Sequence, residues 1–339
     1  MNCGKRIKAL FRLVFWITLI PIAEGEELFL ESRDGNYRLI PGVALQFQHR
    51  TEIKENNADT SGFLLRRGRL KLKGHLIAPE LEYEVEFDVG TPDPGDPRFD
   101  LKDFYLDYRR EKFLRITAGQ FKIPFGFQEL TSSKKQQFVE RSSASEEFAL
   151  GRDLGLMLAG SDEMQSLEYY IGIFNSEGDN NLSADVENLY ARQVVVNPLG
   201  KYKEGESNLQ RTAMYQLTAG LENFYTRETV SGDHLLTGGS FIGYKHSGFP
   251  LRAEYFYRDN RDDSAVTGKG DARGYYAQAG FFLVPRKVEI ALRQSRIIRL
   301  NGNNDAEEQA AVLNYFFQGH HAKLQLEYTR QVIEGIHKH

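Results

Sequence analysis

The sequence predicts an all-β fold, an antiparallel transmembrane β-barrel of the outer-membrane type, from three observations. The chain begins with an export-type segment, apolar and polar residues then alternate in segments of about ten, and alternately short and long turn-rich connections separate these segments. With 41% hydrophobic and 12% aromatic residues in 339, the chain is too apolar for disorder. A mean hydropathy of −0.48 is too polar for a bundle of membrane-spanning helices.

Residues 1–25 have the order of a secretory signal peptide: a basic front, an apolar run at 13–20, Pro21, and the small-residue site Ala23-Glu24-Gly25. An uncleaved membrane anchor is the alternative, but a spanning helix needs about 20 apolar residues and this run stops at Pro21. We therefore expect cleavage, which also removes the single cysteine, Cys3. Subtracting its four basic and one acidic residue from 43 and 47 leaves 39 and 46, so the mature domain, 26–339, is net acidic. This balance does not favour nucleic acid as a partner.

After the signal, the period of the pattern is two. In 81–89, Leu, Tyr, Val and Phe alternate with three glutamates and an aspartate. Because single-chain bacterial barrels have an even strand number, we expect sixteen strands, with fourteen as the fallback and a possible short strand at 27–33. The fifteen clear strand candidates lie near 37–49, 63–76, 81–89, 101–110, 113–121, 153–160, 166–175, 188–197, 212–223, 235–246, 249–258, 272–284, 287–298, 309–317 and 320–331. The long connections, including 198–211, are expected at the exterior, and the tight turns on the periplasmic side.

A soluble all-β protein also alternates, but neighbouring strands here carry opposed rows of charge on one face. An antiparallel register in which paired residue numbers add up to 157 sets one basic row opposite an acidic row, with each pair about 4.5–5.5 Å apart at Cβ. The pairs are Arg69 with Asp88, Lys71 with Glu86, Lys73 with Glu84, and His75 with Glu82. Such a face has to be aqueous, because an unpaired charge in lipid costs several kcal/mol.

This basic row has two interpretations. It is either a cationic strip along which anions pass, or a neutralised ladder that stiffens the wall. Arg67 lies opposite Gly90 in this register, and we expect it to be the least compensated cation and the better anion contact.

Several stretches resemble one known family of porins. They are 66–74 (RRGRLKLKG), 83–88 (YEVEFD), 102–108 (KDFYLDY), 119–132 (GQFKIPFGFQELTS), 138–142 (FVERS), 151–155 (GRDLG) and 194–198 (VVVNP). The segment 63–200 is similar in these stretches to the phosphate-selective porin O and P family. The resemblance implies a sixteen-stranded barrel in the bacterial outer membrane, assembled as a homotrimer, with arginines and lysines that pass anions.

The resemblance also implies that one long loop, here 122–152, folds inward to constrict the pore. An exterior loop with a solvated charge run is the alternative for this segment. Its candidate cations for the anion path are Lys122, Lys134, Lys135, Arg141 and Arg152.

We therefore expect a porin: a water-filled channel for passive diffusion of small anions such as phosphate. The alternatives are a general porin with little ion selectivity, or a barrel that anchors a surface binding protein. Catalytic motifs such as G-x-S-x-G, Walker A and H-E-x-x-H are absent from the sequence, and its eight histidines are scattered. No enzyme activity, metal or cofactor is predicted.

Overall fold

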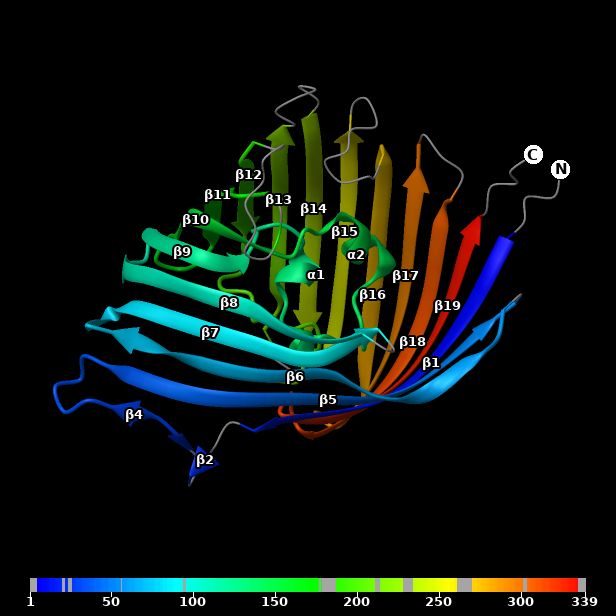
Figure 1. Cartoon of the computed structure of the whole chain (residues 1–339), viewed down its shortest axis with the longest axis horizontal. Helices are drawn as coiled ribbons and strands as arrows, with labels where there is room; N and C mark the ends of the chain where they lie inside the picture. The colour runs from blue at the N-terminus through cyan, green and yellow to red at the C-terminus, as the bar shows by residue number, and fades with distance from the viewer. Residues whose placement is uncertain are drawn as a thin grey trace.

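The computed structural model describes residues 5–19, 22–23, 26–55, 57–93, 96–176, 178, 187–210, 214–227, 234–260, 270–300 and 304–334. One 17-stranded sheet contains the two-residue strand β4 (Leu30–Glu31) and sixteen longer strands that close into an antiparallel barrel. In Figure 1, β13 to β19 form one side of the wall and β5 to β9 cross in front of it, while α1 and α2 lie inside.

The sixteen wall strands follow one another around the barrel in chain order. They are β1 (Lys5–Leu19), β5 (Arg38–Lys54), β6 (Thr60–Leu76), β7 (Ala78–Asp93), β8 (Asp96–Glu111), β9 (Leu114–Lys122), β10 (Arg152–Ser161), β11 (Leu167–Phe174), β12 (Leu189–Val196), β13 (Gln216–Arg227), β14 (His234–His246), β15 (Phe249–Asn260), β16 (Ala272–Val284), β17 (Val288–Arg299), β18 (Ala306–Gln318) and β19 (Ala322–Glu334). A separate two-stranded sheet joins β2 (Ile22–Ala23) to β3 (Glu26–Glu27). The inner helices are α1 (Phe127–Leu130), the 3₁₀ turn η1 (Ser133–Lys135) and α2 (Ser143–Phe148).

All fifteen strand candidates are confirmed, and so is the count of sixteen. The sixteenth strand, however, is β1 rather than a strand at 27–33, where only β4 pairs with the start of β5. β1 pairs antiparallel with β19 on one side and with β5 on the other. The export signal at 1–25 stays a prediction, and two residues of its expected cleavage site, Glu24 and Gly25, lie outside the described residues.

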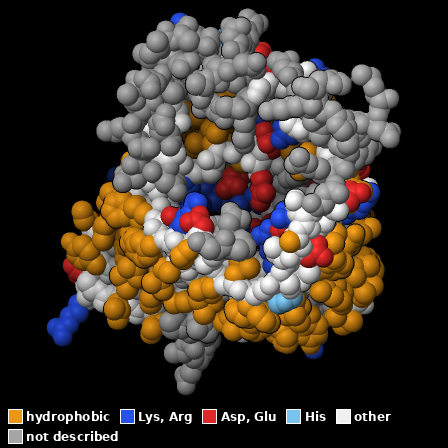
Figure 2. Space-filling model, turned by 45° about the vertical axis from the view of Figure 1, so that its right-hand side comes forward, with side chains coloured by type: hydrophobic (Ala, Val, Ile, Leu, Met, Phe, Trp, Pro, Cys, Tyr) orange, Lys and Arg blue, Asp and Glu red, His pale blue; other side chains and the backbone are white. Residues whose placement is uncertain are grey.

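The alternation sorts side chains between the two faces of the wall. Leu70, Leu72 and Phe104 are exposed on the outside, while Arg67, Glu86 and Asp103 are buried on the inside. The space-filling view shows the result: hydrophobic side chains cover the outer wall, and charged side chains line the hollow (Figure 2). Closure leaves no unpaired sheet edge, which is what a lipid environment requires. No helix among the described residues is long and apolar enough to span a membrane.

Most connections at one end of the barrel are short, and most at the other end are long. The β1–β5 connection is a long one at the short-turn end, and only two positions separate β7 from β8 at the long-loop end. At the end that carries residues 77, 112–113, 247–248 and 285–287 the turns are short, which is typical of the periplasmic side. The expectation that 198–211 is an exterior loop is wrong, because the β12–β13 connection, 197–215, lies at this same end. Its described part turns into the barrel, where Glu206, Ser207 and Asn208 are buried.

Candidate functional site in the barrel lumen

The charge ladder between β6 and β7 has the predicted register. Arg69 pairs with Asp88, Lys71 with Glu86, Lys73 with Glu84 and His75 with Glu82. Side chains also reach diagonally: Arg69 contacts Asp88 at 3.0 Å and Glu86 at 3.3 Å. Lys71 lies closer to Glu84, at 2.5 Å, than to Glu86, at 3.9 Å. His75 instead contacts the Gly35 carbonyl oxygen through Nε2, at 2.9 Å. This row is therefore largely neutralised within the wall.

Arg67 does not match its prediction as the least compensated cation. Its Nη2 lies 2.7 Å from Glu140, and its Nη1 donates to Gln46 on β5. Glu140 also accepts from Arg66 Nε at 2.7 Å. Burial disfavours the charged form of Glu140, but Arg67 and Arg66 hold its pKa well below the usual range. The sequence register could not show this contact, because Glu140 comes from the distant 123–151 segment.

The segment 123–151, here called the inner segment, is attached to the wall through its own backbone. Glu254 on β15 accepts from the amide N–H of Gln128 at 2.9 Å, and Glu222 on β13 accepts from that of Gly126 at 2.9 Å. Gly126 has a φ of +86°, a conformation that glycine adopts without the cost a Cβ would impose. Further along, Glu327 on β19 accepts from Val139 N–H at 2.7 Å. Buried wall carboxylates thus satisfy backbone donors of a segment without a sheet of its own.

The 197–215 connection meets the inner segment at the centre of the barrel. Glu206 accepts from Gln137 N–H at 2.7 Å and from Gln128 Nε2 at 3.0 Å. Arg252 on β15 and Lys245 on β14 complete this contact: Arg252 lies 3.4 Å from Glu206, and Lys245 donates to the Gly205 carbonyl oxygen at 2.6 Å. These cations are buried and bonded to protein oxygens, so they support the inward fold rather than face a solute.

Aromatic side chains fill the space between the inner segment and the wall formed by β13 to β17. Phe148 of α2 stacks on Phe256 with ring centroids 5.2 Å apart, and Phe125 meets Phe224 edge-on at 4.8 Å. A Cβ at Gly274 would lie 2.5 Å from the Phe148 ring, so glycine at this position lets α2 approach β16. This half of the interior is a packed core.

Three adjacent hollows lie on the opposite side, mostly next to β5 to β10. The first, of about 200 Å³, lies towards the long-loop end and has eight cations and two carboxylates in its lining. They are Arg66, Arg67, Arg69, Arg98, Lys102, Lys122, Arg141, Arg152, Asp88 and Asp100. A second hollow of about 430 Å³ and a third of about 530 Å³ extend towards the short-turn end. Arg69 lines all three and therefore lies at their junction.

Most cations predicted for the loop 122–152 line these hollows as members of ion pairs. Arg141 lies 2.8 Å from Glu129, Arg152 lies 2.8 Å from Asp103, and Lys122 lies 3.7 Å from Glu129. Lys135 is paired with Glu204 of the 197–215 connection at 2.5 Å.

Lys134 differs from these cations. It lines the third hollow beside Lys71, Lys73 and Lys135, and it has no ion-pair partner among the residues that the structure describes. Burial and the neighbouring charges of Lys71 and Lys135 lower its pKa. It is the predicted site residue with the least charge compensation.

Sequence reasoning missed the basic contribution of β8 and β9. Arg98 and Lys102 line the first hollow, and Arg109 and Arg115 line the second. Arg109 and Arg115 both approach Asp107, at 2.9 Å and 3.4 Å. Alternation along β8 would have placed Arg109 with Asp107 on the inner face. Bulges in the β7–β8 pairing shift the alternation near the start of β8. The sequence pattern alone therefore does not place Arg98 and Lys102 in the lumen.

Among the described residues, one group of carboxylates has the spacing of a possible cation site. Oxygens of Glu84, Glu86 and Asp103 lie within 4.8 Å of one another. Lys71 and Arg152 already bind this group, with Arg152 2.8 Å from Asp103 and 3.9 Å from Glu86. The arrangement is an ion-pair network that joins β6, β7, β8 and β10.

Comparison with known proteins agrees with this geometry. The sequence profile of the phosphate-selective porin O and P family matches residues 42–337. The chain belongs to this family. It is a porin of the bacterial outer membrane. No curated protein sequence matches it.

Among solved structures, a loop-deletion mutant of OmpT, an outer membrane protein of Vibrio cholerae, aligns with a TM-score of 0.51 and 8% identity, covering 97% of this chain and 99% of that one. OccK2 (OpdF) of Pseudomonas aeruginosa aligns with a TM-score of 0.49 and 10% identity, covering 97% and 96%. At this identity, the OmpT likeness shows the barrel fold alone.

Proposed function

We propose that this porin passes small anions, phosphate among them, by passive diffusion. The observation that supports the proposal is the first hollow, where eight cations and two carboxylates form the lining at the long-loop end. A cationic mouth raises the local concentration of anions, and its low-dielectric walls strengthen the effect. Beyond the Arg69 junction, Lys71, Lys73 and Lys134 continue the basic lining into the third hollow.

The mechanism is electrostatic. Arginine and lysine N–H groups replace part of the hydration shell of an anion at the constriction, and they have to release it again for conduction. Carboxylate neighbours keep the binding weak: Arg66 and Arg67 share Glu140, and Arg152 holds Asp103. The inner segment provides the constriction in this proposal, because it fills the interior beside β13 to β17, whereas the three hollows lie mostly beside β5 to β10.

A general porin with little ion preference is the second candidate, and the ladder favours it. Arg69 and Lys71 have carboxylates within 4 Å, and paired charges attract ions weakly. The two candidate functions differ in how much uncompensated positive charge remains along the path. Lys134 separates them best, because an anion channel needs its unpaired charge and a general porin does not.

Reversal potentials in a planar bilayer under a potassium chloride gradient test the proposal. We expect the wild type to be anion-leaning and Lys134→Glu to move the potential towards the cation-selective side. Lys112→Glu is the matched control, because Lys112 is exposed at a short turn and outside the three hollows. Repeating the gradient with potassium phosphate tests preference for phosphate over chloride.

Each outcome has a defined meaning. A wild-type potential near zero supports the general porin, and a folded barrel without conductance supports a surface anchor. An unchanged potential in Lys134→Glu contradicts our assignment of Lys134.

We also propose that residues 1–25 act as the export signal. The structure uses the same residues for β1, and because β1 is antiparallel to both neighbours, β5 and β19 run parallel to each other. After removal of the signal, the barrel closes either through a direct parallel pairing of β5 with β19 or through another antiparallel strand between them. The intact mass of the protein from outer membranes tests this: loss of 25 residues supports the signal, whereas a full-length mass shows that β1 belongs to the mature barrel.

Assembly as a homotrimer, as the family resemblance implies, is a further part of the proposal. Native mass spectrometry from detergent is expected to show three copies per particle, and a monomer would contradict it.

A further inference from the structure

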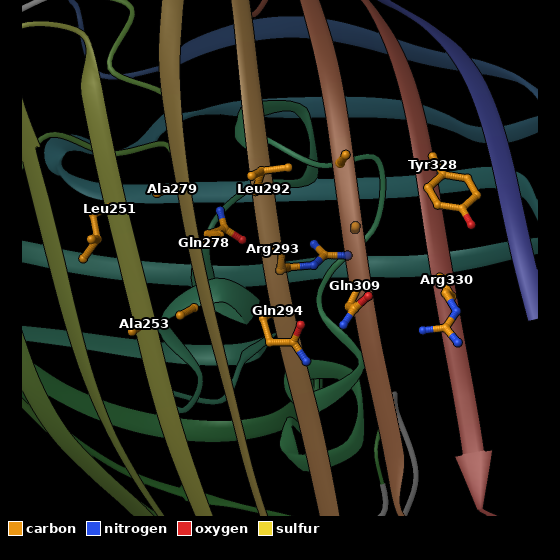
Figure 3. A pocket seen from close by; sticks show the side chains of 13 residues that line it. Leu251, Ala253, Gln278, Ala279, Leu292, Arg293, Gln294, Gln309, Tyr328 and Arg330 are labelled. Atoms are coloured by element: carbon orange, nitrogen blue, oxygen red, sulfur yellow. The ribbon is translucent and has the colours of Figure 1, made fainter. Parts of the chain in front are cut away.

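The outer wall has a hollow on its membrane-facing side. It has a volume of about 700 Å³ and lies over β15 to β19. Its floor consists of small side chains at outward positions, Ala253, Ala277, Ala279 and Ala311, and Leu292 and Tyr328 flank it. Figure 3 shows Ala253, Ala279, Leu292 and Tyr328 along neighbouring strands. Small residues in a row lower the wall surface relative to the leucines and aromatics around them, and an apolar groove results.

Polar side chains border this groove on one side only. Ala253, Ala277, Gln294, Gln309 and Arg330 are successive partners across β15 to β19, so they form one continuous row. In Figure 3, Gln294, Gln309 and Arg330 lie nearer the arrowhead of β19 than Leu292 and Tyr328 do. That arrowhead is at the long-loop end, which is the exterior side of the membrane.

The next row towards that end adds charge. Arg296 on β17 is exposed and directly opposite Glu307 on β18. The Glu307 carboxylate accepts instead from Gln294 at 2.9 Å and from Gln309 at 3.2 Å. Within the described part of the chain, neither Arg296 nor Arg330 has an ion-pair partner. An arginine on the lipid face is destabilising at the midplane and less so near the surface, so an anionic partner would stabilise both.

The opposite wall lacks this combination. On β6 and β7, the outward positions Leu70, Leu72, Val85 and Phe87 are apolar along the described ladder, with no outward charge between them. The outward face of the β6–β7 ladder therefore does not share the arginines found over β17 to β19.

We propose that this groove binds a phosphorylated, multi-acyl glycolipid of the outer leaflet, of the lipid A type. Apolar and basic surfaces follow one another along the wall in the order that such a molecule needs. The apolar groove faces the hydrocarbon, and Arg296 and Arg330 lie further towards the exterior, where the phosphates of the lipid are. Arg296 and Arg330 lie two strands apart, about 10 Å, and one outward row apart, about 7 Å, so their backbones are separated by about 12 Å. Two phosphates of one headgroup can each meet one of these long side chains. A second copy of this chain would gain from the alanines but would bring the two arginines near like charges.

Native mass spectrometry of the detergent-purified protein with added lipid tests the proposal. We expect lipid A adducts on the wild type, and far fewer with dephosphorylated lipid A, phosphatidylethanolamine or phosphatidylglycerol. The double variant Arg296→Gln/Arg330→Gln is expected to lose at least about tenfold in apparent affinity, which is about 1.4 kcal/mol. Ala277→Phe, which fills the groove and keeps both arginines, is expected to weaken binding as well.

Arg192→Gln is the matched control, because Arg192 is an exposed outward arginine on β12, away from the groove. Binding that is equal for phosphatidylglycerol and lipid A, or equally reduced by Arg192→Gln, overturns the proposal. A loss of oligomers in Arg296→Gln/Arg330→Gln with unchanged lipid adducts also overturns it and makes the face an interface between copies. If the melting temperature of the double variant equals that of Arg192→Gln, misfolding is excluded as the cause of its weaker lipid binding.

Discussion

The two halves of the barrel interior contain the same kinds of residue and use them differently. Beside β5 to β10, arginines, lysines and carboxylates line open hollows. Beside β13 to β19, Arg252, Glu254 and Lys323 are buried and bind the inner segment, as when Lys323 donates to the Gln136 carbonyl oxygen at 2.7 Å. An inward charge on a barrel strand therefore does not by itself indicate a solute path. Such a charge lines a solute path only where an open hollow faces it and the inner segment does not cover it.

Removing the inner segment gives the largest expected effect. If residues 128–147 are replaced by a short Gly-Ser linker, the filled half becomes aqueous, and we expect single-channel conductance to rise about several-fold, because pore area sets conductance in a water-filled barrel. Planar-bilayer recordings measure the change, and circular dichroism checks that the strands remain. Unchanged conductance in a folded barrel would show that the inner segment lies outside the conducting path.

A pair of matched carboxylate variants compares the two halves directly. Glu254→Gln weakens acceptance from the amide donors of Phe127 and Gln128, and a buried donor left unsatisfied costs about 1–3 kcal/mol. Glu84→Gln on the open side removes one partner of a water-exposed pair, which is worth about 0–1 kcal/mol. Thermal unfolding in detergent should therefore show a clearly lower Tm for Glu254→Gln. Equal losses would mean that the two halves do not differ in this way.

The smallest expected effect is a pH dependence at the border of the two halves. Desolvation inside the barrel, together with the Glu140 and Glu308 carboxylates, raises the pKa of Glu146 to about 7, although its side chain keeps contact with the solvent. Since this pKa is raised from 4.5, the folded state holds the proton to higher pH than the unfolded state, and stability falls as pH rises from about 4.5 to 7.

The same ionisation adds a negative charge to the lumen. We therefore expect anion preference to decrease between pH 6 and pH 8, by at most about twofold in the permeability ratio. Glu146→Gln should remove the dependence in bilayer reversal potentials, whereas Glu163→Gln at an exposed turn should retain it. A pH profile unaffected by Glu146→Gln would assign the dependence to another group.

Local patterns predicted the wall well, because a strand's alternation and a tight turn determine its register. The ladder from Arg69 to His75 is the clearest example: it keeps the predicted register, although a register shift between His75 and Leu76 separates it from the turn at Ile77. The lumen was harder to predict. The contacts Arg67–Glu140 and Lys135–Glu204 join residues 73 and 69 positions apart in the sequence. These residues come together only when the barrel closes and the connections fold into its lumen. The inward turn of 197–215 has no periodic signal of its own.

The position of β1 bears on the order in which the barrel assembles. Most neighbouring strands around the wall are consecutive hairpins, which form early because their loops are short. The contact of Arg12 with Glu327 instead spans 315 positions along the chain. In a chain that keeps residues 5–19, such a pairing is entropically the slowest to establish, so the cylinder is sealed there last. Until then, two strand edges stay unpaired, and unpaired edges are where an extended segment can add to a sheet.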